Sequence, residues 1–128
     1  MRKEIVATNE APAAVGPYSQ ATKVGDWLFL SGQIPLEPTT GQIASGGIVP
    51  QTRRVLENVR AVLKAAGATF EDVVRVNVYL IDLGDFAQMN EIYATYFPKD
   101  PPARATVGVA ALPRGAAVEI ECTAYLGA

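Results

Sequence analysis

The sequence predicts an α+β fold in which one mixed β-sheet carries two helices on a single face. Apolar residues alternate with polar ones in segments near both ends of the chain and once in the middle, as is typical of strands. Two segments between these strands repeat their apolar residues at helical spacing. Strands, helix, strand, helix and strands in this order favour helices that share one face of the sheet. At 128 residues the chain is expected to form one domain, residues 1–128.

The N-terminal part is expected to form three strands. The first lies near Lys3–Ala7 and is followed by a proline-rich turn, Ala11–Pro17. Ser19–Val24 and Trp27–Ser31 form a predicted hairpin, because the Gly-Asp pair between them is a strong turn signal.

A loop and the first helix follow. Pro35–Pro50 is rich in glycine and proline and is predicted as a loop that contains a small ribbon. From Gln51 the apolar period becomes helical, and Gly67 is expected to end the helix. The apolar face of this helix consists of Val55, Leu56, Val59, Val62, Leu63 and Ala66.

The C-terminal half is expected to continue as strand, helix and two strands. Alternation in Val73–Ile81 places Val74, Val76, Val78 and Leu80 on one face and Arg75, Asn77 and Tyr79 on the other. The second helix runs from about Asp85 to Phe97, with the apolar stripe Phe86, Met89, Tyr93, Tyr96 and Phe97. The last two strands lie near Ala103–Ala110 and Val118–Leu126.

The sheet face that the helices leave uncovered indicates self-association. It carries Arg75, Asn77, Tyr79, Glu119, Glu121, Thr123 and Tyr125. This face is too aromatic for full exposure and too polar for a core. A second copy of the chain commonly covers such a face, so we expect a closed homo-oligomer, the alternative being a solvated face.

Composition argues against several classes of protein. No apolar run approaches the roughly 18 residues of a membrane span, and the N-terminus lacks the apolar core of a signal peptide, so no membrane association is expected. The single cysteine excludes an internal disulfide, which makes the reducing cytoplasm the expected compartment. A net charge of −2 argues against a general nucleic-acid binder, because affinity for phosphates depends on clustered Lys and Arg.

The lack of histidine narrows the possible chemistry further. It excludes a Ser-His-Asp or Cys-His catalytic group and any histidine-ligated metal site. The sequence also has no glycine loop of the kind that cradles phosphates. An enzyme with this sequence is expected to use no metal and no cofactor, and to rely on a carboxyl group, Lys, Tyr or the thiol for proton transfer.

The segment PPARATVGVAALPRGAAVEIE, residues 101–121, contains the two most informative side chains. Arg104 is a fixed cation among small and aliphatic residues, and Glu119 alternates with Val118 and Ile120 on an apolar strand. Burying such a carboxylate is costly unless something offsets its desolvation. A guanidinium and a carboxylate in one cleft would bind a small carboxylic acid and move a proton or a water.

Strand geometry limits how these two side chains can meet. If the last two strands formed a direct hairpin, Glu119 would lie roughly 16 Å along the strand from the residue opposite Arg104. They could not then share one small ligand inside a single chain. Either the two strands are not neighbours, or the cleft is formed between subunits.

Several segments together resemble a known family. APAAVGPYSQA (11–21), LSGQIP (30–35), LENVRAVLKAAGAT (56–69) and PARATVGVAALPRGAAVEIE (102–121) are similar, in the right order, to the reactive intermediate deaminase (Rid) family, RidA type. The resemblance implies a chorismate-mutase-like α+β fold, assembled as a homotrimer with ligand clefts between subunits. It also implies hydrolysis of 2-aminoacrylate, 2-iminobutanoate and related enamine or imine acids to 2-keto acids and ammonia, without a cofactor.

The same resemblance assigns roles to individual residues. Arg104 matches the arginine that holds the substrate carboxylate, and Glu119 matches the carboxylate that places the attacking water. Positions that line the cleft fall on Tyr18, Ser31, Gly32 and Asn90. Thr106 stands where cysteine is common; threonine preserves a role of the backbone but not one of a thiol. Alternation places Cys122 toward the helices, so it is no substitute.

Two sets of alternatives stay open. Tyr18 is equally well explained as a turn aromatic at the edge of the core, and Asn90 as a packing residue of its helix. The main alternative function is a non-catalytic trimer that binds or senses small 2-keto acids through Arg104, and only Glu119 distinguishes it from an enzyme. A ribonuclease is disfavoured by the acidic charge and the lack of histidine, and a chorismate mutase is suggested by the fold alone.

Overall fold

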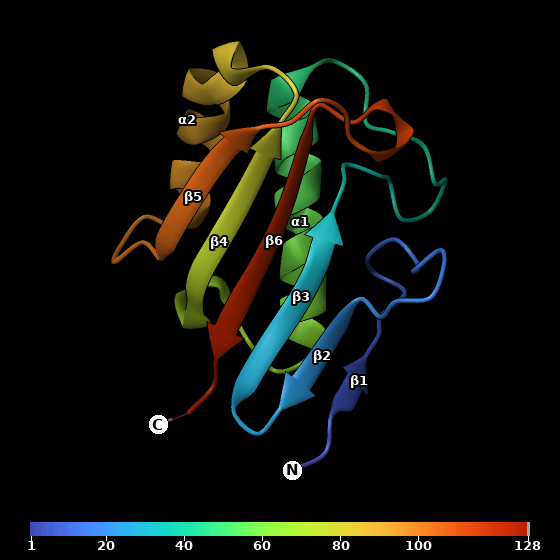
Figure 1. Ribbon diagram of the computed structural model, residues 1–128, viewed down its shortest axis with the longest axis vertical. Helices are drawn as coiled ribbons and strands as arrows, with labels where there is room; N and C mark the ends of the chain where they lie inside the picture. The colour runs from blue at the N-terminus through green and yellow to red at the C-terminus, as the bar shows by residue number, and fades with distance from the viewer. Residues whose placement is uncertain (128) are drawn as a thin grey trace.

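The computed structural model describes residues 1–127. Its strands form one mixed sheet in the order β1-β2-β3-β6-β4-β5, and both helices lie behind that sheet (Figure 1). The strands are β1 (Glu4–Val6), β2 (Ala21–Val24), β3 (Trp27–Gln33), β4 (Val73–Leu80), β5 (Ala103–Gly108) and β6 (Val118–Tyr125). The helices are α1 (Ile48–Ala65) and α2 (Phe86–Tyr96), with the short 3₁₀ turns η1 (Phe70–Asp72), η2 (Leu83–Asp85) and η3 (Pro113–Gly115). The predicted mixed sheet with two helices on one face is confirmed.

The order of the strands decides one question that the sequence left open. β5 pairs with β4 in parallel, while the other neighbouring strands pair antiparallel. A parallel pair needs a crossover connection, and α2 supplies it between β4 and β5. As a result β4 lies between β5 and β6, so the last two strands are not neighbours.

The core lies between the sheet and α1. The predicted apolar face of this helix is buried, with Val55, Leu56, Val59, Val62 and Leu63 each at most 2% exposed. The helix begins at Ile48, before its expected start at Gln51, with Pro50 in its first turn. Proline is tolerated there because the first backbone N–H groups of a helix have no partner within it. The predicted ribbon in the preceding loop is a single bridge between Leu36 and Ile43.

One prediction for β4 is wrong. Val74, predicted on the core face, is 42% exposed, whereas Val73 is buried. The register between β4 and β6 shifts between Val73 and Arg75, which makes Val74 the extra residue of a β-bulge. From Arg75 onward the strand alternates as predicted.

Within residues 1–127, neither helix combines the length and apolar character that a membrane span requires.

Candidate active site

Arg104 lies on the helix-covered side of the sheet, on the edge strand β5. It is in register with Val76 of β4, whose side chain is buried under the helices, and residues in register point to the same face. Its Nη1 donates a hydrogen bond of 2.7 Å to Oδ1 of Asn90. The guanidinium carbon also lies 4.6 Å from the ring centroid of Tyr93 and 5.6 Å from that of Phe86. Because Phe86, Asn90 and Tyr93 follow helical spacing, one stripe of α2 holds the guanidinium.

The contacts of Arg104 correct the expected role of Phe86. Helical spacing predicts this residue in the apolar stripe of α2, but it is 40% exposed and lies beside the guanidinium. Tyr93 is buried as predicted, and its ring faces Arg104 as well. Sequence reasoning missed both as partners of Arg104, because helical spacing alone does not distinguish a core residue from one that contacts a cation.

A surface pocket of about 410 Å³ lies over this side of β5. It is lined by Asn90 and Arg104, together with Tyr93, Ala94, Phe97, Pro101 and Pro102. Thr106 follows Arg104 by two residues and points to the same side, but it does not line this pocket. Its hydroxyl is buried and finds no hydrogen-bond partner within residues 1–127.

Glu119 lies on the opposite, open face of the sheet, in register with Tyr79 of β4. Within residues 1–127 its carboxylate makes no hydrogen bond, whereas Glu121 Oε1 accepts bonds from the Tyr79 hydroxyl and from Asn77 Nδ2. Burial raises the pKa of Glu119 above its ordinary value, and the negative charge of Glu121 raises it further. Glu119 is therefore a half-buried carboxylate that is free to take up a proton, while Glu121 links β6 to Asn77 and Tyr79 of β4.

A bulge in β3 brings the backbone against Glu119. The register between β3 and β6 shifts between Leu30 and Gln33, so the extra residue lies at Ser31-Gly32. A Cβ atom at Gly32 would overlap the Glu119 carboxylate, so this close approach requires glycine. The Ser31 hydroxyl donates a 2.6 Å hydrogen bond to the carbonyl of Ser19, which fixes the bulge to the preceding loop.

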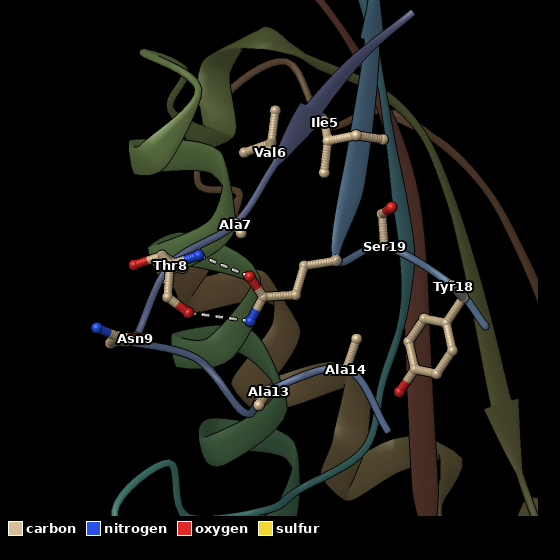
Figure 2. Close-up of a pocket in the computed structure, with 10 residues that line it drawn as sticks. Ile5, Val6, Ala7, Thr8, Asn9, Ala13, Ala14, Tyr18 and Ser19 are labelled. Atoms are coloured by element: carbon tan, nitrogen blue, oxygen red, sulfur yellow. Dashed lines mark hydrogen bonds between the residues drawn. The ribbon is translucent and has the colours of Figure 1, made fainter. Parts of the chain in front are cut away.

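The loop that carries Tyr18 is held by a residue that sequence reasoning missed. Gln20 is buried, and its side chain accepts a hydrogen bond from Thr8 N at 2.7 Å and donates to Thr8 O at 3.1 Å, the two dashed lines of Figure 2. It also donates to the carbonyl of Pro12 at 2.7 Å. The signal available in the sequence was a glutamine two residues after the turn aromatic Tyr18, and its burial is known only from the structure. Tyr18 itself is 52% exposed at the end of this loop.

The predicted site residues thus form two groups. Tyr18, Ser31, Gly32 and Glu119 line one pocket of about 420 Å³ on the open face. Arg104 and Asn90 line the other pocket, across the sheet. The structure does not bring the guanidinium and the carboxylate together within one chain, since β4 separates their strands and the two side chains point to opposite faces.

Cys122 points toward the helices, as predicted, and is 5% exposed. Burial raises the pKa of its thiol to about 12. A thiol with this pKa is protonated at neutral pH and is a poor nucleophile. Within residues 1–127, no cluster of three or more His, Cys, Asp or Glu side chains is placed to hold a metal ion.

Comparisons with known proteins agree with the motifs. A family model described as Endoribonuclease L-PSP matches residues 8–126. The chain is 53% identical to a RutC family protein of Pyrococcus abyssi, over 98% of each chain. It is 49% identical to the 2-iminobutanoate/2-iminopropanoate deaminase of Mus musculus, over 98% of this chain and 93% of that one.

Two solved structures extend the agreement to the fold. RidA from the Antarctic bacterium Psychrobacter sp. is 47% identical with a TM-score of 0.92, over 95% of this chain and 98% of that one. Escherichia coli TdcF with bound serine is 41% identical with a TM-score of 0.93, over 97% of this chain and 99% of that one. The chain therefore belongs to the Endoribonuclease L-PSP family, and the resemblance to the reactive intermediate deaminases that its motifs indicated is confirmed.

Proposed function

We propose that this protein is an enzyme that hydrolyses reactive enamine and imine acids, such as 2-aminoacrylate and 2-iminobutanoate, to 2-keto acids and ammonia without a cofactor. The observation that carries the proposal is the half-buried Glu119 carboxylate, which lies against Gly32 and makes no hydrogen bond within residues 1–127. Relatives from Mus musculus and Homo sapiens, 49% and 46% identical, are named 2-iminobutanoate/2-iminopropanoate deaminase and support this substrate class.

The proposal includes a homotrimer with a cleft at each subunit interface. Arg104 and Glu119 can contact the same ligand only if the β5 edge of one copy lies against the open sheet face of the next copy. This contact joins two different surfaces, and a ring of three copies closes it. The open face supports such a contact, because Trp27 and Phe29 of β3 are 45% and 46% exposed there. Aromatic side chains of this kind are enriched in protein interfaces.

In the proposed mechanism, Arg104 binds the substrate carboxylate through two parallel hydrogen bonds. Protonation of an enamine at carbon gives the imine. Water then adds to the imine carbon while Glu119 takes one of its protons, and Glu119 passes that proton to the nitrogen, which gives the tetrahedral carbinolamine. Glu119 then takes the proton of the carbinolamine hydroxyl and passes it to the nitrogen, so that ammonia leaves and the 2-keto acid remains. Because free imines hydrolyse spontaneously, positioning and one acid–base group are a sufficient catalyst.

Thr106 takes part in this mechanism through its backbone. β5 is an edge strand, so the backbone groups on its outer side pair with no other strand within residues 1–127. They are available to hold the water or the substrate nitrogen. The side chain at this position then needs no thiol, which fits threonine where cysteine is common.

The acid side of the pH profile is expected to report Glu119. Its carboxylate must be ionised to accept a proton, and its pKa is raised above 4.5, so kcat/KM falls as pH decreases through a value above 4.5. Glu121→Gln removes a negative charge that helps to raise the pKa of Glu119. The decrease of kcat/KM on the acid side should therefore occur at lower pH in this variant. Profiles of kcat/KM against pH for the parent and for Glu121→Gln would show this. The assignment would be contradicted if the acid side of the parental profile gave an apparent pKa at or below 4.5, or if Glu121→Gln raised this apparent pKa.

The contact between Arg104 and Tyr93 gives a second prediction. Tyr93→Leu removes the ring under the guanidinium and is expected to raise KM by roughly 2- to 30-fold, the equivalent of about 0.5–2 kcal/mol, with a smaller effect on kcat. Tyr93→Phe keeps the ring and should retain the parental KM. Steady-state kinetics, with thermal denaturation to confirm folding, would test this. An equal loss in both variants would instead assign the effect to the hydroxyl.

One observation favours a second candidate function, a trimer that binds or senses small amino or keto acids without turnover. TdcF, a relative of the same fold, has been solved with bound serine. A coupled assay separates the two functions: a pyridoxal-phosphate dehydratase acts on serine or threonine, and release of keto acid is followed with and without this protein. Faster release supports the enzyme. Binding of 2-oxobutanoate without faster release supports the binder.

Ribonuclease activity is not part of the proposal, although the family description names it. The sequence has a net charge of −2 and no histidine. Binding to a phosphate backbone depends on clustered Lys and Arg. The absence of a nucleic-acid partner stays a prediction.

A further inference from the structure

Glu57, Arg60 and Tyr96 form a cluster of side chains that joins α1 to α2. The Tyr96 hydroxyl donates a hydrogen bond of 2.7 Å to Oε2 of Glu57. Nη1 of Arg60 donates to both oxygens of the same carboxylate, at 2.9 and 3.1 Å. The pair of Arg60 with Glu57 lies within α1, so the bond from Tyr96 is the one that crosses between the helices. We call these three side chains the Glu57 cluster.

The bond from Tyr96 matters because burial anchors little of α2. Of the eleven residues of this helix, Met89, Ile92 and Tyr93 are buried. Tyr96 is the last residue of the helix. Burial, together with the bond to Glu57, raises the pKa of Tyr96 to about 12, so the hydroxyl stays protonated and donates at neutral pH. The Glu57 cluster therefore fixes the C-terminal end of α2 against α1.

A line of aromatic rings connects the Glu57 cluster with Arg104. The ring centroid of Phe70 lies 5.4 Å from that of Tyr96 and 5.1 Å from that of Phe97. The Phe97 centroid lies 4.7 Å from that of Tyr93, whose ring contacts the Arg104 guanidinium. Because side chains packed this closely leave no room to move independently, a displacement of the end of α2 displaces the ring beside the guanidinium.

The orientation of the guanidinium depends on α2. The contacts described above, from Phe86, Asn90 and Tyr93, all come from this helix. Within residues 1–127, β5 pairs with β4 alone, so the strand that carries Arg104 is held on one side. Figure 1 shows α2 behind this edge of the sheet. Where α2 lies therefore decides where the guanidinium points.

We propose that Glu57 and Tyr96 are positioning residues for Arg104: their hydrogen bond fixes α2, and α2 orients the guanidinium toward the substrate carboxylate. Neither residue lines the pocket beside Arg104. The inference rests on the proposed function in taking a 2-imino or 2-keto acid as the ligand of Arg104. Two parallel bonds to a carboxylate require one orientation of the guanidinium. Releasing α2 therefore weakens binding, while the carboxylate that activates water lies across the sheet and is unaffected.

Tyr96→Phe tests the proposal, because it removes the hydroxyl and keeps the ring. Calorimetry with 2-oxobutanoate measures Kd, and the coupled assay measures KM and kcat. Both Kd and KM are expected to rise by about 2- to 30-fold, the range that residues coupled to a site from a distance produce, with kcat near the parental value. A loss of folded protein would instead lower the apparent kcat and the number of binding sites without raising Kd.

Matched variants distinguish the hydrogen bond from general stability. Glu57→Gln keeps an oxygen that accepts from Tyr96 and should keep the parental Kd, whereas Glu57→Leu removes it and should match Tyr96→Phe. Leu28→Val is the control for stability. Leu28 is fully buried on β3, which β6 and β4 separate from β5. This variant should lower the melting temperature and leave Kd unchanged.

A double variant tests whether the effect passes through Arg104. Arg104→Lys already lacks the guanidinium that α2 orients. In this background Tyr96→Phe should change Kd by less than about 2-fold, because two changes that act through one group are not additive. An effect on Kd as large as in the parent background would contradict the proposal.

The possible results separate this proposal from the proposed function. An unchanged Kd in Tyr96→Phe, or an equal rise in Glu57→Gln or Leu28→Val, overturns the positioning role and leaves the deaminase intact. A parent that binds 2-oxobutanoate without accelerating release of keto acid overturns the deaminase, while the Kd values still decide the positioning role. A parent that does neither overturns both. A rise in Kd confined to Tyr96→Phe and Glu57→Leu supports the positioning role.

Discussion

Arg104→Lys is expected to lose most of its deaminase activity although it keeps the positive charge. Lysine cannot reproduce the planar fork that forms two parallel bonds to a carboxylate. The substitution also removes the cation–π contact of the guanidinium with Tyr93 and the hydrogen bond from Nη1 to Asn90. A hydrogen bond to a charged group is worth about 1.5–3 kcal/mol, so kcat/KM should fall by roughly 10- to 150-fold. The coupled assay measures turnover, and calorimetry with 2-oxobutanoate measures binding.

Arg53→Lys is the matched control for this substitution. Arg53 is an exposed residue of α1 and lines none of the pockets described above. This variant should keep both turnover and binding. If Arg104→Lys bound 2-oxobutanoate as tightly as the parent, the carboxylate would be anchored by a different residue.

Glu119→Gln is expected to separate binding from turnover. Glutamine keeps the shape of the side chain but cannot accept a proton from water. Loss of a general base typically costs about 10²–10⁴ in rate, so hydrolysis should slow by that factor while 2-oxobutanoate still binds. The removal of this half-buried charge should not destabilise the fold, because partial burial already disfavours the ionised carboxylate.

Glu91→Gln, an exposed change on α2, controls for the loss of one negative charge. It should leave turnover unchanged. Unchanged turnover in Glu119→Gln would mean that Glu119 is structural and that another group activates the water.

The periodicity of the chain predicts most of the fold. Helical spacing identifies the buried face of α1, and alternation identifies which residues of β6 face the helices, Cys122 among them. The two β-bulges escape this reasoning, because one extra residue interrupts the alternation without changing the composition of the strand. Val74 is predicted on the wrong face for this reason. In the other bulge, the role of Gly32 becomes clear only from the structure, where its backbone lies against the Glu119 carboxylate.

The candidate site is less predictable than the fold. Motif resemblance names Arg104 and Glu119, but it contains no information on which faces of the sheet they occupy. That depends on the parallel pairing of β4 with β5, which places Arg104 beside Val76 and under α2. The aromatic contacts of Arg104 are equally hidden, since Phe86 and Tyr93 share a helical spacing with ordinary core residues. Only the tertiary structure distinguishes these roles.

The central claim is that each active site takes Arg104 from one subunit and Glu119 from another. It is tested most directly by mixing the two weakened variants. Arg104→Lys and Glu119→Gln are co-expressed with different tags, trimers that carry both tags are purified, and mass spectrometry confirms their composition. In every trimer that carries both tags, one of the three clefts takes Arg104 from a Glu119→Gln copy and Glu119 from an Arg104→Lys copy, so one cleft in three regains both intact residues.

The purified mixed trimers are therefore expected to recover about a third of the parental activity per subunit, far above either variant alone. Activity no higher than the average of the two variants, in trimers shown to be mixed, would contradict it.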